Sequence, residues 1–146
     1  MRMRLYALDE GEIRQKSSII CENVVALADW PAVKRVSCYQ SQESLREVDT
    51  SKIISHIREN WPSIELDIIE PNKQAALPRT QYDLIIVPVL GFDTSYNRLG
   101  RGGGWYDRFL SSQETARTIG LAFSCQAIDT VPIEDFDVEL DDIITE

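Results

Sequence analysis

The sequence predicts an α/β fold: an open, mostly parallel sheet with helices on both faces, arranged in the three layers of a Rossmann-like domain. Short apolar segments rich in β-branched residues alternate along the chain with segments whose apolar residues recur at helical spacing. Residues 84–90, LIIVPVL, form a continuous apolar run of the length expected for a strand buried on both faces. Because 146 residues suit one domain, we expect residues 1–146 to form a single unit.

Three segments have the features of helices. In the first, Asp9 followed by Glu12 resembles a capping box, and apolar residues then recur at helical spacing. Helices are therefore expected over residues 9–29, from a cap at Asp49 or Thr50 to Asn60, and over residues 104–112. The only histidine, His56, is interpreted as a helix-surface residue, since no cysteine or carboxylate motif accompanies it.

Strands are expected at residues 33–39, 64–69, 84–90, 118–123 and 142–145. Pro88 cannot donate a hydrogen bond to a neighbouring strand, so it should mark the end of its own strand. Parallel sheets of this kind bind ligands beyond the carboxyl ends of their strands. The glycine-rich loop at residues 100–104 follows the strand expected at 84–90, so we expect the site there.

Composition and charge narrow the classes of partner. The net charge of −9 disfavours nucleic acid and anionic membrane surfaces, and seven of the acidic residues lie between Glu134 and Glu146. The longest apolar run is too short for a membrane helix, so a cytoplasmic location is expected. Cys21, Cys38 and Cys125 are odd in number and widely spaced, which indicates free thiols rather than disulfides or a zinc site.

The segment RLGRGGGWYD has the composition of an anion site. Glycine backbone groups and two arginines can bind a phosphate, although the loop lacks the lysine of a Walker A motif and the spacing of a dinucleotide fingerprint. The loop taken alone is better explained as a tight strand-to-helix connection, and it is the arginines and Asp107 that favour a site. Asp107 suits Mg²⁺ beside a phosphate or, alternatively, a helix dipole. Trp105 and Tyr106 suit stacking on a planar ring or packing in the core.

Residues 98–110, preceded by LIIVPVLGFD, closely resemble the signature of the 5-formyltetrahydrofolate cyclo-ligase family, Arg-Leu-Gly-x-Gly-x-Gly-Tyr-Tyr-Asp-Arg. Trp105 replaces the first tyrosine of that pattern. Glu47 to Thr50 looks like the family's Glu-x-x-Thr segment, and IGLAFSCQ at 119–126 is similar to another family segment. The acidic ending at 132–145 also follows the family pattern.

The resemblance implies ATP-dependent cyclisation of 5-formyltetrahydrofolate to 5,10-methenyltetrahydrofolate, with ATP and Mg²⁺ as cofactors and a formylated folate as the small-molecule partner. It implies a monomer or small homo-oligomer. The implied nucleotide-binding residues are Arg98, Gly100, Arg101, Gly102, Gly103 and Gly104; the implied catalytic residues are Arg98, Arg101 and Tyr106; the implied substrate-binding residues are Glu47, Trp105 and Tyr106; and the implied metal ligands are Asp107 and Asp137.

The chain departs from the family pattern at three places. It starts after the family's basic N-terminal segment, leaving Arg2 and Arg4 as substitutes, and it lacks some tens of residues between Trp61 and Tyr82. Phe136 stands where many members have histidine. Two alternatives to the ligase therefore stay open: a non-catalytic nucleotide- or folate-binding relative, and a ligase-like enzyme that uses another small acceptor.

Overall fold

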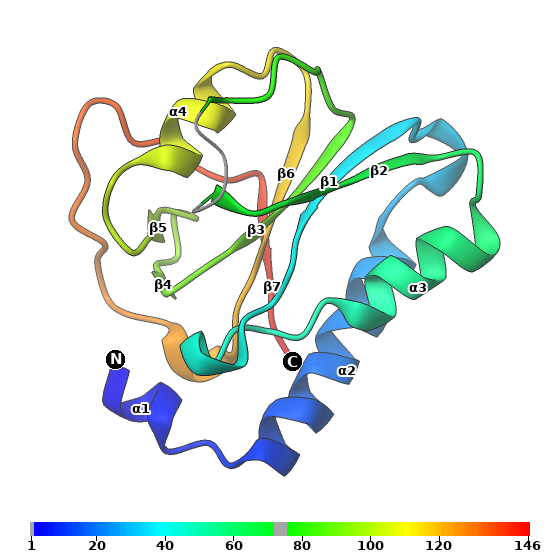
Figure 1. Cartoon of the computed structure of the whole chain (residues 1–146). Coiled ribbons are helices and arrows are strands. Elements are labelled where there is room, and N and C mark those ends of the chain that lie inside the picture. The colour runs from blue at the N-terminus through cyan, green and yellow to red at the C-terminus, as the bar shows by residue number, and fades with distance from the viewer. Residues whose placement is uncertain (1, 72–75) are drawn as a thin grey trace.

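The computed structural model describes residues 2–71 and 76–146, and its centre is a five-stranded parallel sheet with strand order β2-β1-β3-β6-β7 (Figure 1). The strands are β1 (Arg35–Tyr39), β2 (Glu65–Ile69), β3 (Leu84–Pro88), β6 (Arg117–Leu121) and β7 (Asp142–Ile144). All four neighbouring pairs are parallel. The predicted sheet is confirmed, and β3 ends at Pro88 as expected.

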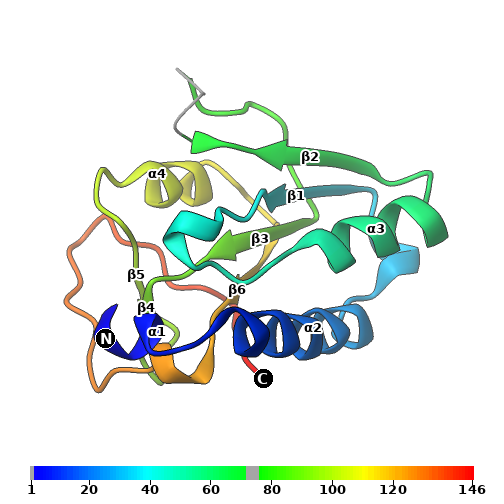
Figure 2. The ribbon, with the colours of Figure 1, turned by 60° about the horizontal axis from the view of Figure 1, so that its bottom comes forward.

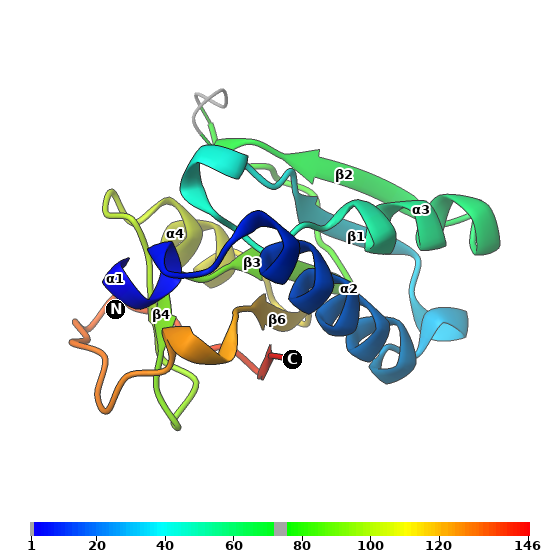
Figure 3. The ribbon, with the colours of Figure 1, turned by 90° about the horizontal axis from the view of Figure 1, so that it is seen from below.

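Helices cover both faces of the sheet, which confirms the predicted layers. The helices are α1 (Arg2–Tyr6), α2 (Glu10–Leu27), α3 (Ser51–Asn60) and α4 (Trp105–Ser111). In Figures 2 and 3, α2 and α3 lie together on one face, whereas α4 lies on the opposite face. Among the described residues, none of these helices combines the length and the hydropathy needed to span a bilayer.

The alternation of β3 explains why the molecule has a core on each face. Leu84 and Ile86 pack with the buried residues of α2 and α3, and Ile85 and Val87 pack with Phe109 of α4 and its neighbours. Successive side chains of a strand point to opposite faces, so a strand covered on both sides must be apolar throughout. The four consecutive buried residues from Leu84 to Val87 meet this requirement.

The predicted N-cap residues of α2 and α3 are found at their expected positions, although only the first makes its capping hydrogen bonds. Asp9 and Glu12 form the predicted capping box, with Glu12 N donating to Asp9 Oδ1 at 2.7 Å and Asp9 N donating to Glu12 Oε2 at 2.9 Å. Thr50 occupies the N-cap position of α3 but makes no side-chain cap bond. Its hydroxyl instead donates to Tyr39 O at 2.9 Å, because it is buried beside the end of β1.

Residues 91–99 form a hairpin that the sequence analysis does not predict. Strands β4 (Gly91–Phe92) and β5 (Arg98–Leu99) pair antiparallel after β3. Each of the two strands has only two residues, which is too short to give a periodic pattern in the sequence. The hairpin places Arg98 beside the end of β3.

The remaining single-residue predictions have mixed outcomes. All three cysteines are free thiols, and burial raises the pKa of Cys38 to about 12, which keeps the thiol protonated and unreactive at neutral pH. His56 is only partly at the surface: its ring lies 5.5 Å from that of Trp30 and its Nε2 atom is buried.

Candidate functional site

A cleft of about 1340 Å³ opens at the carboxyl ends of β1, β2 and β3. Its walls come from these strand ends, the loop after β1, the glycine loop, α4 and the segment before β7. The nucleotide-binding, catalytic, substrate-binding and metal-binding residues that the family resemblance implies all line this cleft: Glu47, Arg98, Gly100, Arg101, Gly102, Gly103, Gly104, Trp105, Tyr106, Asp107 and Asp137. The fold thus gathers residues from three separate stretches of the chain.

Arg98 is held beside the glycine loop by the end of β3 and by an aromatic ring. Its Nε donates to Pro88 O at 2.9 Å, and the guanidinium carbon lies 5.0 Å from the centroid of the Tyr106 ring. Burial lowers the pKa of Arg98, and the nearby Asp107 carboxylate opposes that effect. A Cβ atom at Gly100 would lie only 2.9 Å from Arg98 Nη2, so glycine is required for this placement.

The next three glycines are required by the backbone itself. Gly102, Gly103 and Gly104 have φ angles of 94°, 80° and 66°, a left-handed run that residues with a Cβ rarely adopt. Arg108 Nη1 donates to Gly103 O at 2.6 Å and so fixes the end of the run. Since α4 has only seven residues, the arginines and the glycine amides supply most of the positive potential for an anion.

Arg101 connects the glycine loop to the loop that follows β1. Its Nη2 donates to Leu45 O at 3.0 Å, and its Nε lies 3.9 Å from Glu47 Oε1. Burial raises the pKa of Glu47, while the hydrogen bond from Gln42 N and the charge of Arg101 lower it in part. Glu47 therefore enters the cleft as a carboxylate shielded from water, with a side chain that is only 9% exposed.

Asp107 and Asp137 line the cleft from α4 and from the segment before β7. Asp107 Oδ1 accepts from Val138 N at 3.1 Å, and Asp137 Oδ2 accepts from Glu134 N at 2.8 Å. The second oxygen of each carboxylate makes no hydrogen bond to the residues that the structure describes. Within that part of the chain, no three Asp, Glu, His or Cys side chains are grouped to hold a metal ion. Two carboxylates with free oxygens suit Mg²⁺, which takes its other ligands from water and phosphate.

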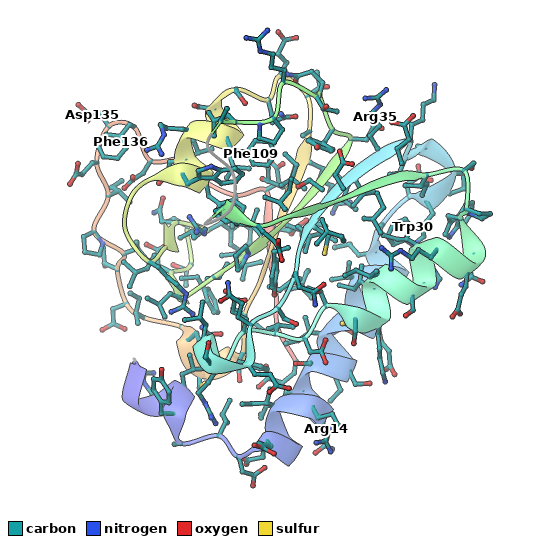
Figure 4. The ribbon with its side chains drawn as sticks, viewed as in Figure 1. Arg14, Trp30, Arg35, Phe109, Asp135 and Phe136 are labelled. Atoms are coloured by element: carbon teal, nitrogen blue, oxygen red, sulfur yellow. The ribbon has the colours of Figure 1, made fainter. Side chains whose placement is uncertain are left out.

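Tyr106 and Trp105 line the cleft from the first turn of α4. Tyr106 is 7% exposed, and its hydroxyl is buried without a hydrogen-bond partner in the described part of the chain. Burial raises the pKa of Tyr106, so the group remains a neutral donor. The ring of Trp105 lies 5.1 Å from those of both Tyr106 and Phe109, and Figure 4 shows Phe109 on the inner side of α4. Trp105 is thus partly core and partly cleft wall.

Sequence reasoning missed several parts of the cleft. Tyr39, Ile69 and Val89 line it at or just beyond the ends of three adjacent parallel strands, and the carboxyl-end rule would have found them. On the other rim, Ile133 and Phe136 are 59% and 63% exposed. Figure 4 shows Phe136 beside Asp135 on the outer loop. No sequence pattern marked these two apolar residues as a rim.

The N-terminal basic residues do not reach the cleft as described. Arg4 Nη1 donates to Ala127 O at 3.3 Å and is not part of the cleft lining. The expectation that Arg4 substitutes for a missing basic segment is therefore not supported by its position. The side chain of Arg2 and residues 72–75 of the shortened 61–82 segment lie outside the described part of the structure.

Comparison with protein families gives a match to the 5-formyltetrahydrofolate cyclo-ligase family over residues 59–146. The mouse 5-formyltetrahydrofolate cyclo-ligase is 28% identical over 184 aligned positions, which cover 100% of this chain and 90% of that protein. This chain has 146 residues, so the mouse protein contains segments that it lacks. The Haemophilus influenzae cyclo-ligase is 42% identical over 84 residues, 55% of this chain and 45% of that protein.

The fold is shared with a solved structure of the same family. A 5,10-methenyltetrahydrofolate synthetase from Mycoplasma pneumoniae superposes with a TM-score of 0.80 at 27% identity, covering 99% of this chain and 92% of that one. The two chains are thus of similar length, and the shortened 61–82 segment is compatible with the shared fold. The family match extends over more than half of the sequence and includes the glycine loop, Asp107 and Asp137. The chain belongs to the 5-formyltetrahydrofolate cyclo-ligase family.

Proposed function

We propose that the protein catalyses the ATP-dependent cyclisation of 5-formyltetrahydrofolate to 5,10-methenyltetrahydrofolate in this cleft, with Mg²⁺ as cofactor. Family membership supports the ligase activity. The observation that carries the proposal is that one cleft unites an arginine and glycine loop with Asp107, Asp137 and the distant Glu47. Such a set provides an anion site, two carboxylates for a hard cation and a carboxylate for a polar substrate.

The chemistry asks for positioning and charge neutralisation rather than for a protein nucleophile. In the reaction, the formyl oxygen attacks the γ-phosphate and ADP leaves. N10 then closes on the resulting imidoyl phosphate, and inorganic phosphate and the N10 proton leave. Arg98 and Arg101 would donate charge-assisted hydrogen bonds to the phosphates, together with the amides of Gly102 to Gly104. Mg²⁺ held by Asp107 and Asp137 would neutralise phosphate charge. The unpartnered hydroxyl of Tyr106 is a donor that a bound ligand can satisfy.

Glu47, Trp105 and Tyr106 would bind the folate. A shielded carboxylate is suited to the amino and ring N–H groups of a pterin, and an aromatic edge is suited to its planar ring. The Mycoplasma pneumoniae neighbour, of similar length, is described as a 5,10-methenyltetrahydrofolate synthetase. This supports the proposed reaction.

The test uses thermal shift and product formation with the purified protein. MgATP and 5-formyltetrahydrofolate, added separately, should each raise Tm, and together they should produce the absorption band of the conjugated methenyl product. Asp107→Ala should abolish the band. Asp83→Asn is the matched control, since Asp83 accepts from Lys34 N and Arg35 N at the opposite end of the sheet and should leave turnover intact. Tm shifts without product would instead indicate a non-catalytic binding relative, and product from another acceptor alone would indicate a different ligase.

A further inference from the structure

Asp93 is a buried carboxylate that does not line the cleft and whose charge is balanced by hydrogen-bond donors. The residue is 4% exposed. Its Oδ1 accepts from Ser95 N at 3.0 Å and Asn97 N at 3.1 Å, and its Oδ2 accepts from Asn97 Nδ2 at 3.2 Å and Val131 N at 2.9 Å. Burial raises the pKa of Asp93, but these bonds outweigh it and lower the pKa below its ordinary value. The carboxylate therefore stays ionised, and it accepts four hydrogen bonds.

One oxygen of Asp93 organises the turn of the β4–β5 hairpin. The turn is tight, with Tyr96 in the left-handed region at φ 62° and Tyr96 N donating to Asp93 O at 3.1 Å. Asn97, which donates to the same carboxylate twice, directly precedes Arg98. The direction in which Arg98 and the glycine loop leave the hairpin is thus set at Asp93.

The other oxygen attaches the segment that carries Asp137 to the same turn. Val131 is held by Asp93 Oδ2, and Leu140 N donates to Tyr96 O at 3.1 Å. Both anchors are buried, at 2% and 3% exposed, whereas residues 132–136 between them are exposed on the cleft rim. Residues 132–139 therefore form a loop whose two ends are bonded to one hairpin turn.

We propose that Asp93 is a positioning residue for the nucleotide site, which holds the 132–139 loop and its Asp137 carboxylate in register with Arg98. Asp93 touches neither nucleotide nor metal in this assignment, which rests on the proposed function of the cleft. Mutation of a residue that hydrogen-bonds to a metal ligand and orients it typically changes metal affinity or activity by about 10- to 100-fold. Among the residues that the structure describes, Asp93 is the one side chain that bonds both to the turn before Arg98 and to the segment before Asp137.

Asp93→Asn is the informative variant, because asparagine has the same shape but only one acceptor oxygen. It can accept from Ser95 N and Asn97 N, or from Asn97 Nδ2 and Val131 N, but not from both pairs. Asp93→Asn should bind MgATP about tenfold more weakly than the wild type, measured by isothermal titration calorimetry with Mg²⁺ in excess. The KM for 5-formyltetrahydrofolate should change by less than about twofold, since the loop ends do not reach Glu47. Amide hydrogen exchange over residues 131–140 should become faster.

Two further variants separate positioning from simple destabilisation. Asp137→Asn should weaken MgATP binding on its own. Adding Asp93→Asn to it should weaken binding by less than the two single effects combined, because part of the effect of Asp93→Asn acts through the Asp137 carboxylate. Asp83→Asn alters an exposed carboxylate that accepts from two backbone N–H groups at the far end of the sheet, and it should leave the MgATP affinity unchanged. If Asp93→Asn does not fold, Asn97→Ala removes the Asn97 Nδ2 bond alone and should shift the MgATP affinity in the same direction by a smaller factor.

The outcomes distinguish this inference from the proposed function. A wild-type protein that binds MgATP but forms no methenyl product contradicts the ligase proposal while the variant comparison still tests Asp93. Three results would overturn the positioning role of Asp93. They are equal weakening of MgATP and folate binding by Asp93→Asn, fully additive effects of Asp93→Asn and Asp137→Asn on MgATP affinity, and wild-type MgATP affinity in Asp93→Asn. A wild-type protein that does not bind MgATP would overturn both.

Discussion

At the scale of single residues, the glycine loop contains glycine for two different physical reasons. Gly102, Gly103 and Gly104 are required by positive φ angles, and no atom lies near a Cβ built at Gly102 or Gly103. Gly100 has no such angle, and a Cβ there would meet the guanidinium of Arg98 instead. The first glycine therefore serves the position of Arg98, and the other three serve the path of the backbone.

This difference predicts that alanine at Gly100 mainly weakens MgATP binding, whereas alanine at Gly103 mainly lowers stability. Gly100→Ala should lower the free energy of unfolding by less than about 1 kcal/mol, because the contacting atoms are the far end of a flexible side chain. It should weaken MgATP binding by about tenfold or more, because Arg98 is displaced from its place over Tyr106. Calorimetry and chemical denaturation measure the two quantities.

Gly103→Ala is the matched comparison within the loop. At φ 80° it should destabilise the protein by about 1–2 kcal/mol through backbone strain, without a clash at Arg98. A Gly100→Ala protein with wild-type MgATP affinity would show that the contact between Gly100 and Arg98 is not relevant to binding.

At the scale of elements, the loop after β1 and the glycine loop are joined across the cleft by Arg101. The join consists of one hydrogen bond to Leu45 O and the ion pair with Glu47. The carboxylate of Glu47 is shielded by burial, so its pKa is raised, and the Arg101 charge offsets part of that rise. The two loops are thus coupled by the charge state of one carboxylate.

The coupling predicts a pH dependence of stability. The folded state holds the Glu47 proton more tightly than the unfolded chain, so the contribution of Glu47 to stability falls as pH rises from its ordinary pKa of 4.5 through the raised value. Arg101→Gln should enlarge this fall, because an uncompensated charge is then buried. Tm measured from about pH 4 to about pH 7 should drop more in Arg101→Gln than in the wild type. In a Glu47→Gln background, Arg101→Gln should add no further pH dependence, and an unchanged difference would contradict this assignment.

At the scale of the whole molecule, Glu146 connects the edge of the sheet to α2 by hydrogen bonds. Glu146 follows β7, and its carboxylate accepts from Lys16 Nζ at 2.8 Å and from Ser124 N at 2.8 Å. Burial alone raises the pKa of Glu146, but these partners outweigh it and lower the pKa to about 2. A single carboxylate thus joins α2, the turn after β6 and the edge strand.

Glu146→Gln should therefore reduce stability at neutral pH. The pKa is depressed on folding, so the stabilisation is present above the ordinary value of 4.5 and is lost as pH falls toward about 2. Allowing for solvent screening, the loss should be about 1–2 kcal/mol near pH 7 in urea denaturation, and the difference from the wild type should shrink as the pH is lowered. Glu65→Gln is the control: its pair with Arg35 is 66% and 47% exposed, and it should change stability by only a few tenths of a kcal/mol. Equal losses in both variants would contradict the assignment.

The local part of the fold and of the site was predictable from the sequence. The apolar run of β3, the capping box of α2 and the end of β3 at Pro88 each depend on neighbouring residues alone. The same holds for the composition of the 98–107 loop, because glycine, arginine and aspartate have their chemistry wherever they occur. The β4–β5 hairpin was missed, since two-residue strands leave no periodic signal.

What the sequence by itself determined is thus the order and type of the main elements, the family resemblance and the residue types of the site. Only the tertiary structure decided that Glu47 pairs with Arg101, that Gly100 makes room for Arg98, and that Asp93 joins the hairpin to the loop carrying Asp137. Pairs such as Asp93 with Val131 N use backbone donors that almost any residue supplies, so no side-chain pattern encodes them. They exist because packing brings distant parts of the chain together, and the geometry of the cleft depends on them.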